Sequence, residues 1–191
     1  MRAGSREVAE SCLDGITMEM VATYCDRLHS SKPDLAARRI EAIGFQVGQQ
    51  LAERLVPVDL LACVNFPFGL ILYTRDRPRF TDHLEVIKFI CKDFWAEVFK
   101  KQIDNLKTNH RGVFVLQDTR FRWLTRISVD SPLTPSEANN TTLAAAQAGG
   151  KYLYFPCGLI RGALTNLGVP CAVSAEIAAL PACSFIIRIK V

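Results

Sequence analysis

Two glycine pairs constrain the fold of this chain more than any other feature of its sequence. Gly44 and Gly48 lie four residues apart in one segment, and Gly158 and Gly162 repeat that spacing later in the chain. Residues four apart lie above one another on a helix, so each pair would expose a strip of bare backbone against which another element can pack closely. A glycine inside a helix costs about 1 kcal/mol relative to alanine. The pairs therefore indicate tight packing and favour a protein that works by fitting one surface against another.

Apolar periodicity predicts four helices. The first covers residues 7–29, the second 33–55 with a proline at its favoured first position, and the third about 82–103. The third has the widest apolar face and should be the most buried helix. The fourth spans 152–167 and ends at Gly168. The apolar face of the first helix consists of Val8, Cys12, Ile16, Met20, Tyr24 and Leu28.

Alternating residues predict two hairpins. The first pairs a strand at 113–116 with a strand at 121–129, and the second pairs 171–177 with 183–191. The order is three helices, a hairpin, a helix and a hairpin, which indicates an α+β fold with helices on one side of an antiparallel sheet. We expect a single domain over residues 1–191, with a solvated loop rich in Ser, Pro, Asn and Gly at 131–150.

Charge and cysteine content limit the kinds of partner and compartment. The chain has 23 basic and 19 acidic residues, and this net charge of +4 is too small to indicate a nucleic-acid partner. Its 7 cysteines include no Cys-x-x-Cys pair, and residues 1–10 contain no apolar run of a signal peptide. Both observations favour reduced thiols in the cytosol. The longest apolar run, from Leu60 to Tyr73, is shorter than the roughly 20 residues that span a bilayer.

One basic cluster keeps an RNA-binding module as an alternative. Its residues are Lys100, Lys101, Lys107, Arg111, Arg120, Arg122 and Arg126, with Phe121 and Trp123 interleaved, as a single-strand binder requires. The same alternation is typical of any half-buried strand. We therefore expect no nucleic-acid partner.

Catalytic and metal chemistry find little support in the sequence. Cys157, Cys171 and Cys183 would have to meet without local pairs to bind zinc. A nucleophilic pair of Cys157 with His110 would need Asn109 or Asp118 as orienting residue, and nothing in the spacing requires such contact. No phosphate-binding glycine motif is present. We expect no cofactor, no metal and no catalytic residue.

Four segments resemble the small subunits of the transport protein particle (TRAPP) family and, within it, the subunit-six branch. They are 44–55, 87–95, the stretch from Thr108-Asn109-His110-Arg111-Gly112 to Leu116-Gln117-Asp118, and Cys157-Gly158-Leu159-Ile160-Arg161-Gly162-Ala163-Leu164. The last motif is shared with the subunit-three type, whereas the third points to subunit six. The resemblance covers most of residues 33–191, and its details look like those of plant members.

The resemblance implies helices packed on a twisted four-stranded antiparallel sheet. It also implies a non-enzymatic subunit that pairs through its first two helices with a subunit-three-type protein and joins other TRAPP subunits, with a homodimer as a further option. The complex tethers vesicles in endoplasmic-reticulum-to-Golgi and Golgi traffic, and promotes nucleotide exchange on a Rab GTPase mainly through other subunits. The implied location is cytoplasmic and peripheral on Golgi and endoplasmic-reticulum membranes, with indirect contact to the Rab GTPase and the membrane.

Carried over to this chain, the pairing face falls on the second helix. It consists of Ile40, Ile43, Gly44, Val47, Gly48 and Leu51. For Ile40 and Val47 an equally good interpretation is that they face their own core, since an amphipathic helix buries one stripe in any case. Gly158 and Gly162 are expected to let the fourth helix sit close to the sheet or the third helix.

The chain departs from the family pattern at two places. The acylated cysteine of the subunit-three type corresponds to Arg77, so no covalent lipid is expected. Residues 58–74 look like an insertion, for which we favour a retained intron. Because related folds can hold an apolar molecule in the core, a small apolar-ligand-binding module of the same fold stays a second alternative.

Overall fold

Alternating apolar residues build a single four-stranded antiparallel sheet in the computed structural model, which describes residues 10–55, 83–109, 111–127 and 148–189. The strands are β1 (Asn105–Thr108), β2 (Val113–Asp118), β3 (Cys171–Ala179) and β4 (Ala182–Ile189), and their order in the sheet is β1-β2-β4-β3. Every second residue of β2 is buried, and Leu116 pairs with the equally buried Phe185 of β4. This face of the sheet forms one side of the core.

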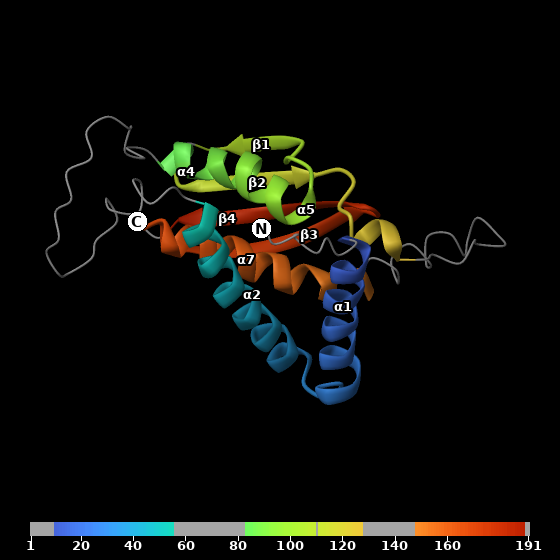
Figure 1. Cartoon of the computed structure of the whole chain (residues 1–191). Coiled ribbons are helices and arrows are strands. Elements are labelled where there is room, and N and C mark those ends of the chain that lie inside the picture. The colour runs from blue at the N-terminus through green and yellow to red at the C-terminus, as the bar shows by residue number, and fades with distance from the viewer. Residues whose placement is uncertain (1–9, 56–82, 110, 128–147, 190–191) are drawn as a thin grey trace, which may run out of the picture.

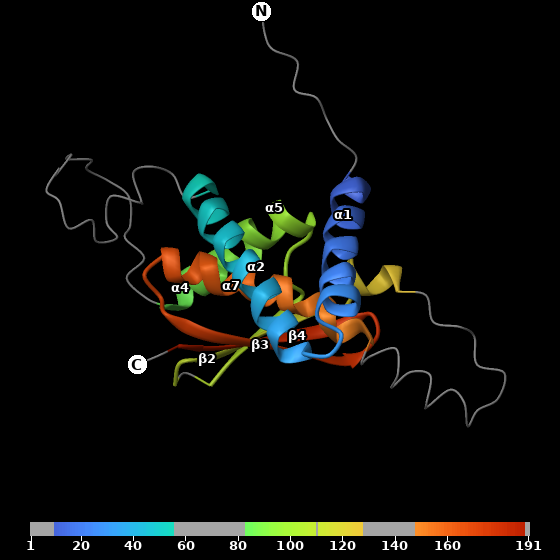
Figure 2. The same cartoon turned by 90° about the horizontal axis from the view of Figure 1, so that it is seen from below.

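The helices cover that face of the sheet (Figure 1, Figure 2). They are α1 (Glu10–Ala22) with its π-helical continuation η1 (Thr23–Leu28), α2 (Pro33–Leu55), a continuous run of α4 (His83–Phe89), η2 (Ile90–Phe94) and α5 (Trp95–Phe99), and α7 (Tyr154–Asn166). There are also two short 3-10 turns: η3 (Leu124–Arg126) follows β2, and η4 (Lys151–Leu153) directly precedes α7. The expected α+β class is confirmed.

The partner of β2 in the first hairpin lies before it in the chain, not after it. β1 pairs with β2, and Leu106 lies opposite Leu116. The segment at 121–129, expected to be the partner strand, is described to residue 127 and forms a turn and η3 instead. The carboxylate of Asp118 accepts the N–H of Arg120 at 3.0 Å and turns the chain away from the sheet. Three closely spaced residues then enter the core together, Phe121, Trp123 and Leu124.

The most buried helix is α7, and not the third helical run as expected. Most of its 13 residues are buried, because it packs on β3 with one side and on α2 with the other. The run of α4, η2 and α5 buries one broad face, which includes Trp95. Gly168 ends α7 with a φ of 80°, and the N–H of Val169 returns to the carbonyl of Leu164 at 2.8 Å, as predicted for a glycine cap.

The expected insertion at 58–74 lies outside the described residues, as does most of the expected loop at 131–150. Both stay predictions.

Candidate partner-binding surface

The two glycine strips contact each other, because α2 and α7 cross at the four glycines. A Cβ atom added to Gly48 would lie 2.9 Å from the Cα of Leu159 and would overlap its carbonyl oxygen. A Cβ atom added to Gly162 would lie 2.8 Å from the carbonyl carbon of Phe45. Carbon atoms in ordinary contact are about 3.5–4.0 Å apart, so no side chain fits between the helices here. The neighbour of the second strip is therefore α2, and not the sheet or the third helix.

Arg161 flanks this crossing on α7. Its guanidinium nitrogen Nε lies 3.1 Å from Oε1 of Glu41, and its guanidinium carbon lies 4.9 Å from the ring centroid of Phe45. An ion pair and a cation–π contact thus join the two helices beside the glycines. The arginine of the Cys-Gly-x-x-Arg-Gly motif therefore supports the same contact between α2 and α7 as the glycines.

The crossing changes the interpretation of the expected interface on α2. Three of its residues are buried within the chain, Ile40, Gly44 and Gly48. The α7 helix of the same chain already occupies the glycine strip that another subunit was expected to cover. The other three residues lie beside the strip and are half-buried against the core, Ile43, Val47 and Leu51. Their contact with a partner stays a prediction.

α1 exposes apolar side chains that the described part of the chain does not cover. Leu13 and Ile16 are 66% and 68% exposed, and Leu28 in η1 is 61% exposed. Leu13, Ile16 and the half-buried Met20 lie three and four residues apart and so form one stripe. Much of the apolar face expected for this helix therefore points to solvent, while Asp14 and Val21 on another face are buried. Contiguous exposed apolar side chains are typical of interaction sites.

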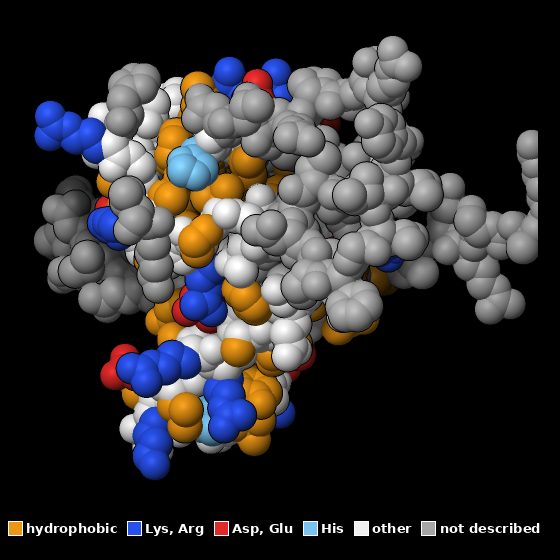
Figure 3. Space-filling view, turned by 90° about the vertical axis from the view of Figure 1, so that its left-hand side faces the viewer, with side chains coloured by type: hydrophobic (Ala, Val, Ile, Leu, Met, Phe, Trp, Pro, Cys, Tyr) orange, Lys and Arg blue, Asp and Glu red, His pale blue; other side chains and the backbone are white. Residues whose placement is uncertain are grey.

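α1 and α2 form an arm that extends away from the sheet. Figure 1 shows them as the two sides of a V that closes near residues 29–32. Figure 3 shows this arm from the side, with basic side chains projecting among hydrophobic ones at its lower end. Exposed charged residues near that end include Arg27, Lys32, Asp34, Arg38 and Arg39. Apolar side chains with a charged rim are the usual composition of a protein–protein interface.

Part of the basic cluster that would support RNA binding is engaged within the chain. Phe121 and Trp123 are 0% and 4% exposed and cannot stack on bases. Lys101 donates to Asp118 at 2.7 Å and to Asp104 at 3.0 Å. Arg122 and Arg126 both bind Asp14. These five side chains stabilise the fold, whereas Lys100, Arg111 and Arg120 of the cluster are exposed.

The cysteines discussed as nucleophile or metal ligands are buried. Burial raises the pKa of the Cys157 thiol to about 12 and also raises the pKa of Cys183, so neither is a reactive thiolate near neutral pH. Across the described ranges, no three His, Cys, Asp or Glu side chains come together as a metal site. The suggested partner of Cys157, His110, lies outside these ranges.

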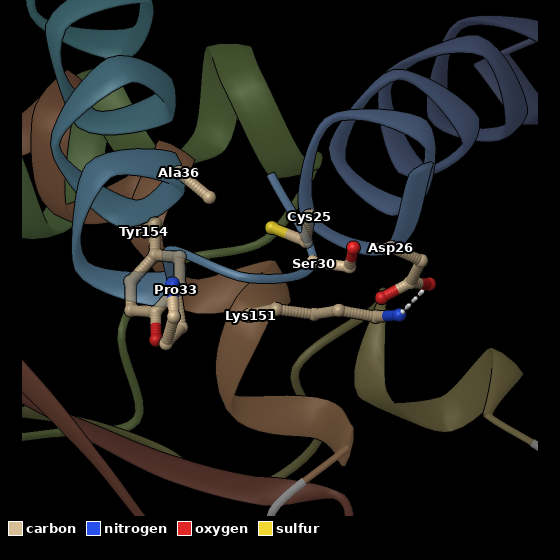
Figure 4. Close-up of a pocket in the computed structure, with 7 residues that line it drawn as sticks. All are labelled: Cys25, Asp26, Ser30, Pro33, Ala36, Lys151 and Tyr154. Carbon is tan, nitrogen blue, oxygen red and sulfur yellow. Dashed lines mark hydrogen bonds and ion pairs between the residues drawn. The ribbon is translucent and has the colours of Figure 1, made fainter. Parts of the chain in front are cut away.

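A pocket of about 380 Å³ lies where η1, the start of α2 and the start of α7 meet (Figure 4). Lys151 extends along it and pairs with Asp26, while Tyr154 and Pro33 lie at the other end (Figure 4). Burial opposes the charge of Lys151, but the hydrogen bond to Asp26 and nearby negative groups outweigh it and raise the pKa of Lys151. Burial raises the pKa of the Cys25 thiol, which also lines the pocket. The pocket wall thus combines an ion pair at one end with apolar side chains, among them Pro33 and Ala36.

In the described part of the chain, no helix has both the length and the apolar character needed to cross a membrane.

Comparison with known proteins yields consistent matches. A family model described as transport protein particle (TRAPP) component matches residues 13–190. Trafficking protein particle complex subunit 6b of Danio rerio is 47% identical over 152 residues, covering 80% of this chain and 78% of that protein. Subunit 6B of Homo sapiens is 44% identical, over 80% of this chain and 77% of that protein. A crystal structure of subunit 3 from Naegleria fowleri, covalently bound to palmitic acid, aligns with a TM-score of 0.52 at 12% identity, covering 92% of this chain and 96% of that one.

Proposed function

This chain belongs to the TRAPP component family, in its subunit-six branch, and we propose that the arm formed by α1 and α2 is the surface through which it pairs with a subunit-three-type TRAPP protein. It is a structural subunit of the TRAPP complex, which tethers vesicles in endoplasmic-reticulum-to-Golgi and Golgi transport. Its contacts with the Rab GTPase and the membrane are indirect, through the assembled complex. It resides on the cytoplasmic side of Golgi and endoplasmic-reticulum membranes as a peripheral component.

The observation that carries this proposal is the uncovered apolar stripe on α1. Leu13, Ile16 and Leu28 are the exposed large hydrophobic side chains of the described residues, and all three lie on the arm. Fully burying one such side chain contributes about 1.5–3 kcal/mol, so a partner that covers all three gains several kcal/mol. On α2 we assign the half-buried Ile43, Val47 and Leu51 to the same partner-binding surface. The glycines of α2 are not part of it.

We infer that the subunit acts by binding rather than by catalysis, and the state of its core groups supports this. The thiols that could serve as nucleophiles in the core are held protonated by burial, which raises the pKa of both Cys91 and Cys157 to about 12. The buried carboxylates are occupied too: Asp14 and Asp118 accept hydrogen bonds from Trp123 and Trp95. These groups stabilise a scaffold that presents the arm.

The experiment is co-expression of the chain with a subunit-three-type TRAPP protein, followed by affinity measurement on the purified pair. Ile16→Asp should weaken pairing at least tenfold, because it places an unpaired charge where an apolar side chain is buried. Its melting temperature should stay near that of the wild type, since Ile16 is 68% exposed in the free chain. A matched control is Ala172→Asp, which adds the same charge at an exposed position of β3.

Two results would contradict the proposal. Pairing that survives both Leu13→Asp and Ile16→Asp would show that α1 is not the contact surface. Failure of the wild-type chain to bind any subunit-three-type protein would remove the proposed partnership itself.

A further inference from the structure

The attachment of α1 to the rest of the chain depends on few side chains. Among its described residues only Asp14 and Val21 are buried, with exposed fractions of 4% and 0%. They lie seven residues apart, which is two helical turns or about 10 Å along the helix axis. Val21, together with the half-buried Met18 and Met20, provides apolar contacts in the second half of α1, close to where η1 and α2 follow. The first two turns of the helix are therefore held at Asp14.

Asp14 is clamped by three donors from one short segment. Its Oδ2 atom accepts a hydrogen bond from Nε of Arg122 at 2.7 Å and lies 2.8 Å from Nη2 of Arg126. Its Oδ1 atom accepts a hydrogen bond from Nε1 of Trp123 at 3.1 Å. Arg126 also donates to the main-chain carbonyl of Ser11 at 3.4 Å. All three donors belong to the turn around η3, which follows β2 and is anchored by the buried Phe121 and Leu124.

The geometry of a helix links this clamp to the exposed stripe. Successive residues are rotated by about 100°, so Ile16 points about 160° away from Asp14, and Leu13 about 100° away. When the carboxylate of Asp14 is fixed, the rotation of α1 about its axis is fixed as well. The direction in which Leu13 and Ile16 project is set by the same contact. A purely apolar contact at this position would permit sliding and rotation, whereas a carboxylate with three directed donors does not.

We propose that Asp14 is a positioning residue for partner binding: through Arg122, Trp123 and Arg126 it orders the first turns of α1 and orients Leu13 and Ile16 toward the incoming subunit. This inference rests on the proposed function, because it assumes that the stripe is the contact surface. Asp14 itself points into its own chain and touches no partner. Its effect on binding is exerted through the order of the helix that carries the stripe.

The test combines hydrogen exchange of the free chain with affinity for the co-expressed subunit-three-type protein. Asp14→Asn keeps the size of the side chain but replaces one acceptor oxygen with an NH₂ group that faces arginine. Those amides of residues 10–17 that are hydrogen-bonded within the helix should exchange at least tenfold faster than in the wild type, with the rest of the chain unchanged, and affinity should fall at least tenfold. Asp14→Glu, which keeps the charge, should recover part of both losses. Glu19→Gln removes the same charge from an exposed position of α1 and should change neither.

Each outcome decides between explanations. Ile16→Asp should reduce affinity without altering exchange in the free chain, so it reports on the contact surface alone. If Ile16→Asp weakens pairing but Asp14→Asn does not, the positioning role is refuted while the proposed function stands. If neither weakens pairing, the surface itself is wrong, and both ideas fail together.

A general loss of stability is distinguishable as well. Faster exchange throughout the chain in Asp14→Asn would mean that the clamp supports the whole fold, and this would overturn a specific role for α1. If Asp14→Asn does not fold, Arg126→Gln carries the test, because it removes one donor and leaves those of Arg122 and Trp123 in place. Local loosening of residues 10–17 with reduced affinity in that variant supports the proposal, and wild-type affinity overturns it.

Discussion

Gly48→Ala tests the helix crossing sharply, because two known effects act in opposite directions. Alanine stabilises a helix interior by about 1 kcal/mol relative to glycine. At the crossing of α2 and α7, however, the added methyl carbon would lie 2.9 Å from the Cα of Leu159 and would overlap its carbonyl oxygen. The sign of the change in stability therefore shows whether the glycine faces a tight contact or open space.

The structure indicates which effect is larger. The obstructing atoms belong to the backbone of α7, so relief requires the two helices to separate by about 1 Å, the difference from an ordinary carbon–carbon contact. Overpacking of a well-packed core costs about 1–3 kcal/mol, and a radial gap of about 0.5–1 Å already removes a quarter to a half of the dispersion attraction of the separated atoms. Both helices also carry fully buried side chains, such as Ile40 on α2 and Ile160 on α7, which would have to move with them. We expect a gross cost of about 3 kcal/mol and a net destabilisation of about 2 kcal/mol.

The assay is urea unfolding followed by far-ultraviolet circular dichroism, with a thermal scan alongside. A net loss of about 2 kcal/mol corresponds to a melting temperature about 4–8 °C lower for a chain of this size. Gly15→Ala is the matched control, because Gly15 is exposed on α1 and a Cβ atom there would have no neighbour within 4 Å. That variant should gain up to about 1 kcal/mol.

Substituting one glycine in each strip gives a second test of the helix crossing. Gly162→Ala should destabilise the chain for the same reason, but the double variant should lose less than the sum of the two single losses, since one separation of the helices accommodates both methyl groups. A Gly48→Ala variant as stable as the wild type, or more stable, would refute the close crossing and reopen the glycines as an external contact.

Two further predictions concern ionisable groups. Burial opposes the charge of Asp104, but hydrogen bonds from the hydroxyl and N–H of Thr119 and from Lys101 outweigh it and lower its pKa to about 2. A carboxyl group with a lowered pKa stabilises the fold above its unfolded pKa of about 4 and loses this contribution as the pH falls toward 2. Asp104→Asn should therefore flatten the decrease of the unfolding free energy over that pH range, as urea titrations at each pH would measure. An unchanged slope would contradict this prediction. Iodoacetamide should label the exposed Cys12 of the native chain rapidly and leave Cys91 and Cys157 unlabelled until unfolding, because burial raises the pKa of both to about 12. Peptide mass spectrometry that finds all three labelled equally in the native chain would speak against the burial of these thiols.

The elements were predictable from sequence where one periodicity dominates a long segment. The second helix begins at Pro33 and ends at Leu55, as its apolar spacing and initial proline indicate. The last hairpin likewise follows from alternation in β4, where Phe185 and Ile187 are buried. The first hairpin was not predictable in the same way. β1 has only 4 residues, and its polar composition gives almost no signal, whereas the aromatic residues after β2 imitate a strand.

The glycine pairs illustrate what a local pattern leaves open. A strip of bare backbone indicates that something packs closely, but it does not say whether the neighbour belongs to the same chain. The available signal was that two strips of equal spacing occur in one chain, so that each could satisfy the other. Only the family resemblance, and not the geometry of Gly44 and Gly48 themselves, places a partner on that helix.

The arm shows what apolar periodicity leaves undecided. The apolar periodicity of α1 was visible, yet periodicity alone does not tell whether an apolar stripe faces its own core or another subunit. Asp14 is a charged residue, which sequence alone would place in solvent, so the inward face of the helix had no local signal. Its donors lie more than a hundred residues away in sequence, so only the folded chain brings them together.

Each of the two tryptophans of the chain donates its indole N–H to a buried aspartate. Trp95 donates to Asp118 within the body of the fold, and Trp123 donates to Asp14 on the arm, each at 3.1 Å. Because indole emission responds to loss of such a hydrogen bond and to entry of water, Trp123 is a native optical reporter of the arm, and Trp95 adds a background that does not depend on Asp14. The emission of the unlabelled chain should therefore change when the arm detaches from the body of the fold and the bond between Trp123 and Asp14 opens.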